Sequence, residues 1–104
     1  MRARPSALGH VDEDQSGACT QWHRAQVARL ARRLGYELLW ATTESSLCLV
    51  DQARQSDVDA VILASCQHID VLTLDRLMHT CDVEIAVPRD TFARYLGGQQ
   101  GWLA

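Results

Sequence analysis

The stretch Val58-Asp59-Ala60-Val61-Ile62-Leu63-Ala64-Ser65 decides the fold that we predict for this chain. It is short, almost entirely apolar and rich in β-branched residues, and Asp57 and Asp59 open it. A run without polar alternation is buried on both of its faces, which is typical of a central strand in a parallel sheet. We therefore expect helices to cover both faces of the sheet around this strand.

Helical patterns and further short apolar runs alternate on both sides of the central stretch. The expected strands span residues 6–11, 36–41, 58–65 and 83–87, and the expected helices span residues 21–34, 47–55, 71–78 and 91–96. Because a helix separates each pair of consecutive strands, the strands should run parallel with right-handed crossovers. The sequence therefore predicts a three-layer α/β/α domain around a mostly parallel four-stranded sheet.

Residues suited to helix ends mark the expected helices. Thr20, Asp70 and Asp90 are candidate N-caps, and Gly35 is expected as a left-handed C-cap. Trp22 is expected at the upper end of the buried stripe of the first helix. In each of the first three expected helices, one apolar stripe should face the sheet. The stripes are Val27, Leu30, Ala31 and Leu34 in the first helix, Leu47, Val50 and Ala53 in the second, and Val71, Leu74, Leu77 and Met78 in the third. In the last helix we expect Phe92, Tyr95 and Leu96 to be packed.

Length and composition indicate one small globular domain. The chain has 104 residues, 47% of them hydrophobic, which suits a single core. We expect a flexible N-terminus at 1–6, one domain at 7–96 and a C-terminal tail at 97–104. No apolar run is long enough to span a bilayer and no hydrophobic signal region follows Met1, so we expect a cytoplasmic protein without a membrane partner. The four Cys form no CxxC pair, which favours small buried side chains in a reducing compartment.

Charge is distributed unevenly along the chain. Residues 1–35 hold six Arg and three acidic residues, whereas residues 36–104 hold four Arg and ten acidic residues, so the net charge is −3. A net acidic domain is a poor general binder of nucleic acid, because non-specific affinity depends on cationic contacts with phosphates. Any basic surface must be local to the first helix, where the possible DNA contacts are Arg24, Arg29, Arg32 and Arg33.

A binding site is expected where the strands end. In open α/β sheets, ligands bind beyond the carboxyl ends of the strands, where residues 12–17, 42–46 and 65–70 should meet. The carboxylates of Asp12, Glu13 and Asp14 are either ligands of a hard cation or parts of a solvated loop. We favour the loop, because no phosphate-binding or second acidic motif lies beside them. The candidate residues for a pocket at this edge are Asp12, Asp14, Ser16, Ser65, Cys66 and His68.

Nucleophilic and cofactor chemistry have little support in the sequence. Ser16, Ser65 and Cys66 all lie near the carboxyl edge, and His68 lies two positions after Cys66. Side chains at i and i+2 do not reliably meet, so packed or loop residues are the favoured interpretation, with Ser16 as a weak catalytic candidate. No Gly-rich loop follows any strand, so we predict no nucleotide cofactor and lean against an enzyme.

A mirrored pair of motifs raises the question of a zinc site. Cys66-Gln67-His68 and His79-Thr80-Cys81 offer four ligands of the types that zinc binds. The expected helix between them has about ten residues and spans roughly 15 Å. The two pairs should therefore lie at opposite edges of the sheet, and we predict no metal site.

The pattern as a whole resembles the N-terminal catalytic domain of the serine recombinases, the resolvase and invertase family. The resemblance runs from about Ala7 to Arg94 and rests on Ala7–Val11, on the polar loop after it, and on Gln26–Leu38. The last run is similar to the family's first helix entering its second strand. The resemblance implies a resolvase-like fold and association into oligomers.

The motifs that carry the family's reaction differ in this chain. The family ends its first strand with Tyr-x-Arg-x-Ser, whose Ser attacks a DNA phosphate, and residues 10–14 here read His-Val-Asp-Glu-Asp. The family also carries Asp-Arg-Leu-x-Arg after its third strand, where residues 65–70 here contain no Arg. Asp-Arg-Leu occurs only later, at residues 75–77, within an expected helix. Phosphoryl transfer needs cations around the phosphate, so the resemblance implies the fold without the reaction.

The sequence leaves three functional hypotheses. The leading one is a catalytically inactive resolvase-like domain that acts by protein–protein association, with itself or with a partner. The alternatives are a DNA-associated recombinase or nicking protein that uses Ser16, and a binder of a small ligand or nucleotide at the carboxyl edge of the sheet. The candidate interface residues are Phe92, Tyr95, Trp102 and Leu103, although Trp102 would equally well fold back onto its own domain.

Overall fold

The structure is a computed structural model, and it describes residues 4–42, 48–65, 67 and 69–94. Its elements are β1 (Ser6–His10), α1 (Glu13–Ser16), the 3-10 helix η1 (Gly17–Cys19), α2 (Thr20–Leu34), β2 (Glu37–Trp40), α3 (Leu49–Ser56), β3 (Ala60–Leu63), α4 (Val71–Met78), β4 (Asp82–Ile85) and β5 (Asp90–Phe92). The predicted alternation of strands and helices is confirmed through β4. The predictions for residues 1–3, Leu47 and 95–104 lie outside the described residues.

The five strands form one mixed sheet in the order β2-β1-β3-β4-β5. β1 pairs in parallel with both β2 and β3, and β3 pairs in parallel with β4. β5 runs antiparallel to β4 at one edge. The chain first moves from β1 to β2 and then crosses back to β3 on the other side of β1, so the strand order reverses between β1 and β3.

The prediction of a last helix over residues 91–96 is wrong where the structure describes it, and the sheet has a fifth strand that we did not predict. Thr91 lies in β5, and its hydroxyl donates to Oε1 of Glu84 on β4 at 2.6 Å. The Arg89 guanidinium lies 2.8 Å from the same carboxylate oxygen. The hairpin thus gives the buried Glu84 two partners, and it also packs Phe92 against the core.

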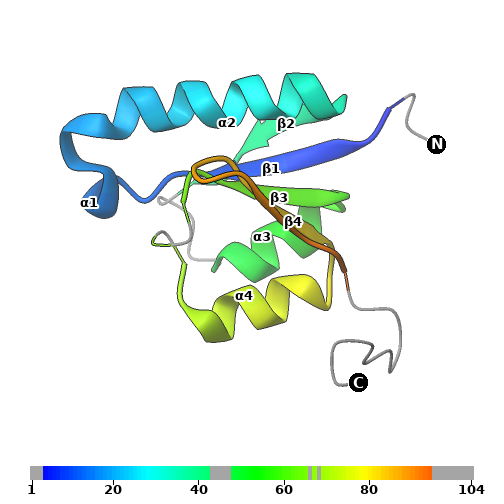
Figure 1. Cartoon of the computed structure of the whole chain (residues 1–104). Helices are drawn as coiled ribbons and strands as arrows, with labels where there is room; N and C mark the ends of the chain where they lie inside the picture. The colour runs from blue at the N-terminus through cyan, green and yellow to red at the C-terminus, as the bar shows by residue number, and fades with distance from the viewer. Residues whose placement is uncertain (1–3, 43–47, 66, 68, 95–104) are drawn as a thin grey trace.

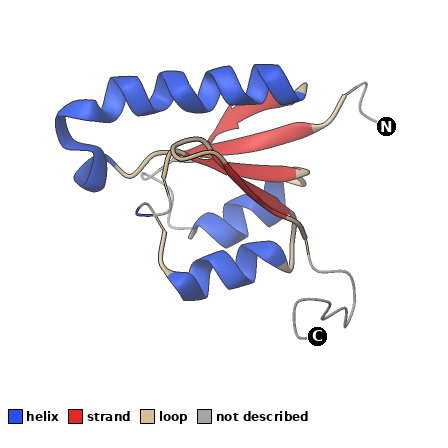
Figure 2. Cartoon of the chain, viewed as in Figure 1, coloured by secondary structure: helices blue, strands red, loops and turns tan. Residues whose placement is uncertain are grey.

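Helices cover both faces of the sheet, as predicted. α2 lies on one face, and α3 and α4 lie side by side on the other (Figures 1 and 2). Along β3, Val61 and Leu63 face α3 and α4, whereas Ala60 and Ile62 face α2, and all four side chains are fully buried. The prediction of a central strand buried on both faces is therefore confirmed.

The buried stripe of α2 is shorter than predicted. Val27, Leu30 and Ala31 are buried against the sheet, but Leu34 is 38% exposed and Trp22 is 51% exposed. A helix of 15 residues is roughly 22 Å long. The strands beneath it have four or five residues and span roughly 13–17 Å, so α2 is longer than the strands, and its N-terminal end extends past the sheet (Figure 1).

The segment at residues 12–17 contains a short helix where we expected only a loop. Asp12 caps α1, because its Oδ1 accepts a hydrogen bond from the backbone N–H of Asp14 at 3.0 Å. Thr20 is not an N-cap: the chain enters α2 through η1, and the Thr20 hydroxyl donates to the carbonyl of Gly17 at 2.8 Å. Gly35 is the predicted left-handed C-cap, with a φ of 82°.

The first turn of α4 is more exposed than predicted. Leu77 is fully buried, but Val71 is 80% exposed and its neighbour Leu72 is 77% exposed. At about 100° per residue, Val71 lies roughly 120° around the helix from Leu77, outside the face that contacts the sheet.

Among the described helices, none has both the length and the apolar character that crossing a bilayer requires.

The described cysteines only partly follow the prediction of small buried side chains. Cys81 is buried, and burial raises the pKa of its thiol to about 11. Cys19 and Cys48 are exposed. Cys66 lies outside the described residues.

Candidate functional site

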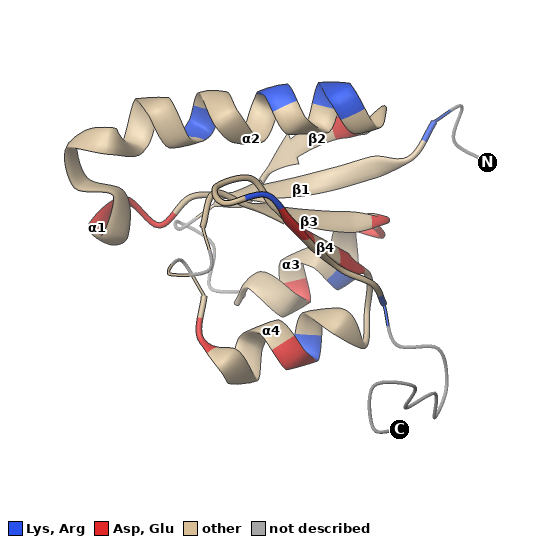
Figure 3. Ribbon diagram, in the orientation of Figure 1, with Lys and Arg blue, Asp and Glu red and all other residues tan. Residues whose placement is uncertain are grey.

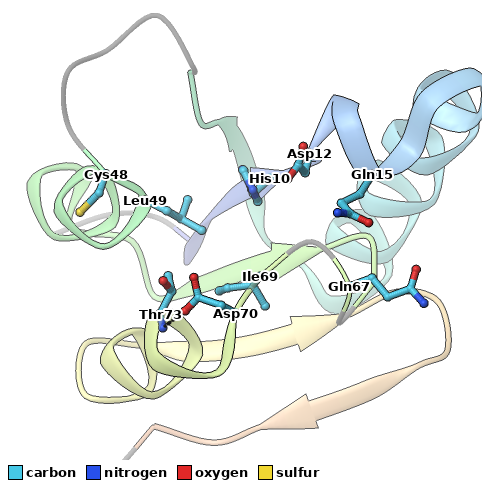
Figure 4. A pocket seen from close by; sticks show the side chains of 9 residues that line it. All are labelled: His10, Asp12, Gln15, Cys48, Leu49, Gln67, Ile69, Asp70 and Thr73. Atoms are coloured by element: carbon cyan, nitrogen blue, oxygen red, sulfur yellow. Dashed lines mark hydrogen bonds between the residues drawn. The ribbon is translucent and has the colours of Figure 1, made fainter.

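A pocket of about 450 Å³ opens at the carboxyl end of the sheet, beside the boundary between β1 and β3. We call it the switch-point pocket, because the strand order reverses at this boundary. Its lining comes from three segments: the end of β1 with α1, the start of α3, and the loop from β3 into α4 (Figure 4). The lining residues are His10, Asp12, Gln15, Cys48, Leu49, Gln67, Ile69, Asp70 and Thr73.

The first side of the pocket is formed by β1 and α1. His10 is the last residue of β1, and alternation along the strand places it on the same face as Leu8, which packs toward α3 and α4. The half-buried Asp12 turns the chain into α1 by capping it, and this turn places Gln15 at the rim. The local sequence therefore supplies an imidazole, a carboxylate and an amide to one wall.

The second side is formed by the loop from β3 into α4. Asp70 caps α4 as predicted, and its Oδ1 accepts from the backbone N–H of Thr73 at 2.7 Å. Hydrogen bonds from the backbone N–H and the side chain of Thr73 hold the pKa of Asp70 below its usual range. Asp70 is therefore an anion at neutral pH. Gln67 and Ile69 complete this wall.

The third side is the start of α3. Leu49 and Cys48 line the pocket there, and the Cys48 thiol donates to Oδ2 of Asp51 at 3.2 Å. Gln52 joins α3 to the end of β2, because its side-chain amide accepts from the Thr42 N–H and donates to the Thr42 carbonyl, both at 2.9 Å. This paired contact fixes where α3 begins relative to the sheet.

The charge of the pocket is anionic. Asp12 and Asp70 are its acidic residues, and no Arg is among the described residues that line it. Its remaining polar groups are uncharged amides, a hydroxyl, a thiol and an imidazole. Within residues 4–42, 48–65, 67 and 69–94, no three His, Cys, Asp or Glu side chains form a group that could hold a metal ion. The pocket is therefore suited to an uncharged or cationic molecule that donates hydrogen bonds.

The predicted pocket residues do not all meet. Asp12 lines the pocket, but Asp14 is exposed on α1 and does not line it. Ser65 lies next to the wall, where its hydroxyl accepts from the Gln67 N–H at 3.2 Å. Cys66 and His68 lie outside the described residues.

Ser16 is buried between α1 and α2, outside the pocket lining. The residue is 7% exposed, and its Oγ lies 2.6 Å from Nδ1 of His23 on α2. The Trp22 ring lies beside His23, with 5.3 Å between the ring centroids. The Ser16–His23 contact joins the short helix to the long one and was not foreseen from the sequence.

At about 100° per residue, the four arginines that we considered as DNA contacts are spread over roughly half of the circumference of α2, and Figure 3 shows the cationic positions along this helix. Arg24 stacks on the indole of Trp40, with its guanidinium carbon 5.0 Å from the ring centroid. Arg32 lines a hollow between α2 and β2. Arg29 and Arg33 are exposed on the remaining faces.

The candidate interface at the C-terminal end is only partly within the described residues. Phe92 is half-buried and packs against the core cluster on the α3 and α4 face, so it supports its own domain. Tyr95, Trp102 and Leu103 lie outside the described residues.

Sequence reasoning identified the location of the pocket but missed most of its lining. His10, Gln15, Leu49, Gln67 and Thr73 carry no motif, and the available signal was their position just before or after a strand end. These residues line one pocket only because the topology of the sheet brings the three segments together.

No protein-family model, curated protein or solved structure matches this chain.

Proposed function

We propose that this chain is a non-catalytic α/β domain that binds a small polar molecule in the switch-point pocket. The observation that carries the proposal is the position of the pocket, where three segments enclose about 450 Å³ beside the β1/β3 boundary. At such a boundary the crossovers leave on opposite faces of the sheet, so a crevice opens between them. Small-ligand sites commonly have volumes of about 300–1,000 Å³, and this pocket falls within that range.

The lining favours an amine or a hydroxyl-rich molecule over a phosphate. Asp12 and Asp70 are carboxylates, and Gln15 and Gln67 present amide groups at the rim. These carboxylates would repel a phosphorylated ligand, and the described lining contains no Arg to offset their negative charge. Leu49 and Ile69 add an apolar surface for the carbon skeleton of the ligand.

Of the expectations that the serine-recombinase resemblance raised, this proposal keeps only the α/β class of the fold. The DNA-cleaving alternative has little support, because Ser16 is only 7% exposed and the strand end beside it is acidic. Of the C-terminal residues considered for association, Phe92 packs against its own core, and Tyr95, Trp102 and Leu103 lie outside the described residues. The small-ligand alternative is supported by a cavity among the described residues.

A thermal-shift screen tests the proposal. The panel should hold small amines, polyols and nucleosides, each beside a phosphorylated or carboxylated counterpart. A ligand that binds only the folded protein raises its stability by about 2.7 kcal/mol at a hundred times Kd. For a domain of this size, that corresponds to a rise in Tm of roughly 10 °C. We expect shifts of this kind from amines or polyols and none from their phosphorylated counterparts.

A matched pair of variants ties any shift to the pocket. Gln15→Trp places an indole at the rim, whereas Gln21→Trp makes the same change at an exposed position on α2 outside the pocket. The first variant should abolish the shift and the second should leave it intact. A panel without any hit, or a hit that survives Gln15→Trp, would reject the proposal.

A further inference from the structure

The open edge of the sheet at β2 offers unused backbone groups. Within the described part of the chain, β2 has β1 as its one neighbour in the sheet. The N–H groups of Glu37 and Ala41 donate to the Pro5 and Gly9 carbonyls of the first-strand segment at 2.8 and 2.9 Å. Because successive peptide groups in a strand point in opposite directions, the N–H groups of Leu38 and Trp40 point away from β1. An additional strand can pair with them.

Two hollows follow this edge on the side of α2. One, of about 290 Å³, lies near the start of β2, with Ala28 and Leu38 in its lining and Arg4 and Arg32 beside them. The other, of about 400 Å³, lies at the end of β2 and is lined in part by Trp40 and Arg24. The β2-segment residues that line them, 36–38 and 40–42, are centred about four positions apart, or roughly 13 Å along the strand. Side chains at i and i+4 of an added strand would therefore reach both.

The charge along this groove is mainly cationic. Arg4 and Arg32 line the first hollow and Arg24 lines the second, and Glu37 and Glu13 are also among the lining residues of the first and second hollow. The linings of the two hollows together hold three Arg and two Glu, so their net charge is positive.

The opposite side of the same edge carries Leu39 and, two positions before it, the exposed Glu37. Leu39 alternates with Leu38 and Trp40 along β2, so it faces away from α2, and it is 42% exposed. A strand that fits both sides carries acidic side chains toward α2 and apolar side chains toward Leu39.

We propose that the β2 edge binds an extended acidic segment of a partner protein as an additional strand. The backbone of the segment pairs with β2, its carboxylates at i and i+4 face the arginine-lined hollows, and its alternate apolar side chains cover Leu39. Strand addition of this kind takes affinity from backbone hydrogen bonds and specificity from alternate side chains. The proposal concerns a surface distinct from the switch-point pocket and does not depend on it.

A second copy of this chain fits the edge less well than an acidic partner. Antiparallel pairing of β2 with itself about a two-fold axis keeps equivalent faces on the same side of the joined sheet. The α2 helices of the two copies would then lie next to each other, with Arg24 and Arg32 of both copies on the facing sides. Like charges placed together in this way oppose association.

Binding of a designed peptide to the full chain tests the proposal. The probe is a fluorescein-labelled ten-residue peptide that alternates valine and glutamate, and its control replaces each glutamate with lysine. Fluorescence anisotropy should show the glutamate peptide binding at least about tenfold more tightly than the lysine peptide, which corresponds to about 1.4 kcal/mol. Equal or absent binding would overturn the proposal.

Neighbouring arginines on one helix provide the matched variants. Arg32→Glu changes the charge of the groove, whereas Arg33→Glu makes the same change on a part of α2 outside the hollows. The first should weaken binding of the glutamate peptide at least about fivefold, and the second by less than about twofold. Equal losses, or equally strong competition by duplex DNA, would show a diffuse cationic helix surface and overturn the proposal.

Hydrogen exchange separates strand addition from other modes of binding. Saturating peptide should slow exchange of the Leu38 and Trp40 amides more than that of the Leu39 amide, which points toward β1. Sedimentation of the chain alone should show a monomer. A dimer that Leu39→Lys dissociates would assign the edge to a second copy, and unchanged exchange at Leu38 and Trp40 would also overturn the proposal.

Discussion

Gly9 is the fourth of the five residues of β1, directly opposite Trp40 in the register with β2. A Cβ at this position would lie 2.9 Å from the Trp40 ring and 3.1 Å from Cδ1 of Leu38. The missing side chain therefore lets the indole lie on the sheet, with Arg24 stacked on it. A lone Gly within a strand is typical of close packing, but only the structure identifies Trp40 as the group that packs there.

The first prediction concerns this contact. Gly9→Ala should lower the free energy of unfolding by about 1–3 kcal/mol, because the ring has to move and overpacked cores are strained. Urea denaturation measures the loss. In a Trp40→Leu background the same change should cost clearly less, because the ring is absent. An equal cost in both backgrounds would show that the ring is not the cause.

Asp70 gives a prediction about pH. Its hydrogen bonds to Thr73 hold its pKa below the ordinary value of 3.8. A carboxyl with a lowered pKa in the folded state contributes stability that is fully present above 3.8 and is lost as the pH falls through the folded value. Asp70→Asn retains a capping side chain but cannot titrate.

The expected result is a difference between two stability curves. From pH 7 down to about 5, the gap in unfolding free energy between the wild type and Asp70→Asn should stay constant. Below the ordinary carboxyl pKa, the gap should change in the direction that favours Asn. Urea titrations across this range provide the measurement, and a gap that moves the other way contradicts the assignment.

At the scale of elements, the β4–β5 hairpin depends on one buried carboxylate. Glu84 is 6% exposed, and it accepts from the Thr91 hydroxyl and pairs with Arg89. Both partners come from the segment after β4, so the carboxylate joins the edge strand to the sheet. The guanidinium of Arg89 also donates to the Asp90 carbonyl, which fixes the turn between the two strands.

Substitution of Glu84 tests this role. Glu84→Ala removes the acceptor of both partners and should cost roughly 1–3 kcal/mol, with the ion-pair part reduced because Arg89 is partly exposed to water. Glu84→Gln retains an oxygen acceptor for Thr91 and should cost less. Urea denaturation distinguishes the two. If Gln proved as destabilising as Ala, the Thr91 hydrogen bond would not be part of the stabilisation.

The same hairpin shows what local sequence can predict. The helix prediction for residues 91–96 relied on Asp90 as a cap and on the spacing of Phe92 with later aromatic residues. Both signals are local, whereas the partner that favours a strand, Glu84, comes from an earlier element. The helices and strands before this hairpin were predictable because the spacing of apolar residues in each one shows which of its side chains are buried. The ends of α2 and α4 were less predictable, because exposure there depends on where the sheet stops.

At the scale of the whole molecule, strand order determines where a site can form. The order of the strands was not predicted from the sequence, which indicated only that they are parallel. Placing β1 between β2 and β3 brings Asp12, Leu49 and Asp70 around one cavity, although they belong to three separate segments. The edge of the sheet that holds the site was predictable, whereas its lining required the topology.

The central claim is that the switch-point pocket binds a small polar molecule, and backbone amide NMR with a hit from the thermal-shift screen tests it most directly. We predict that chemical shifts will change for the amides of His10, Gln15, Leu49 and Thr73, and that the same ligand will leave the Gln15→Trp variant unchanged. Shift changes confined to α2 and β2, or no changes at saturating ligand, would contradict the claim.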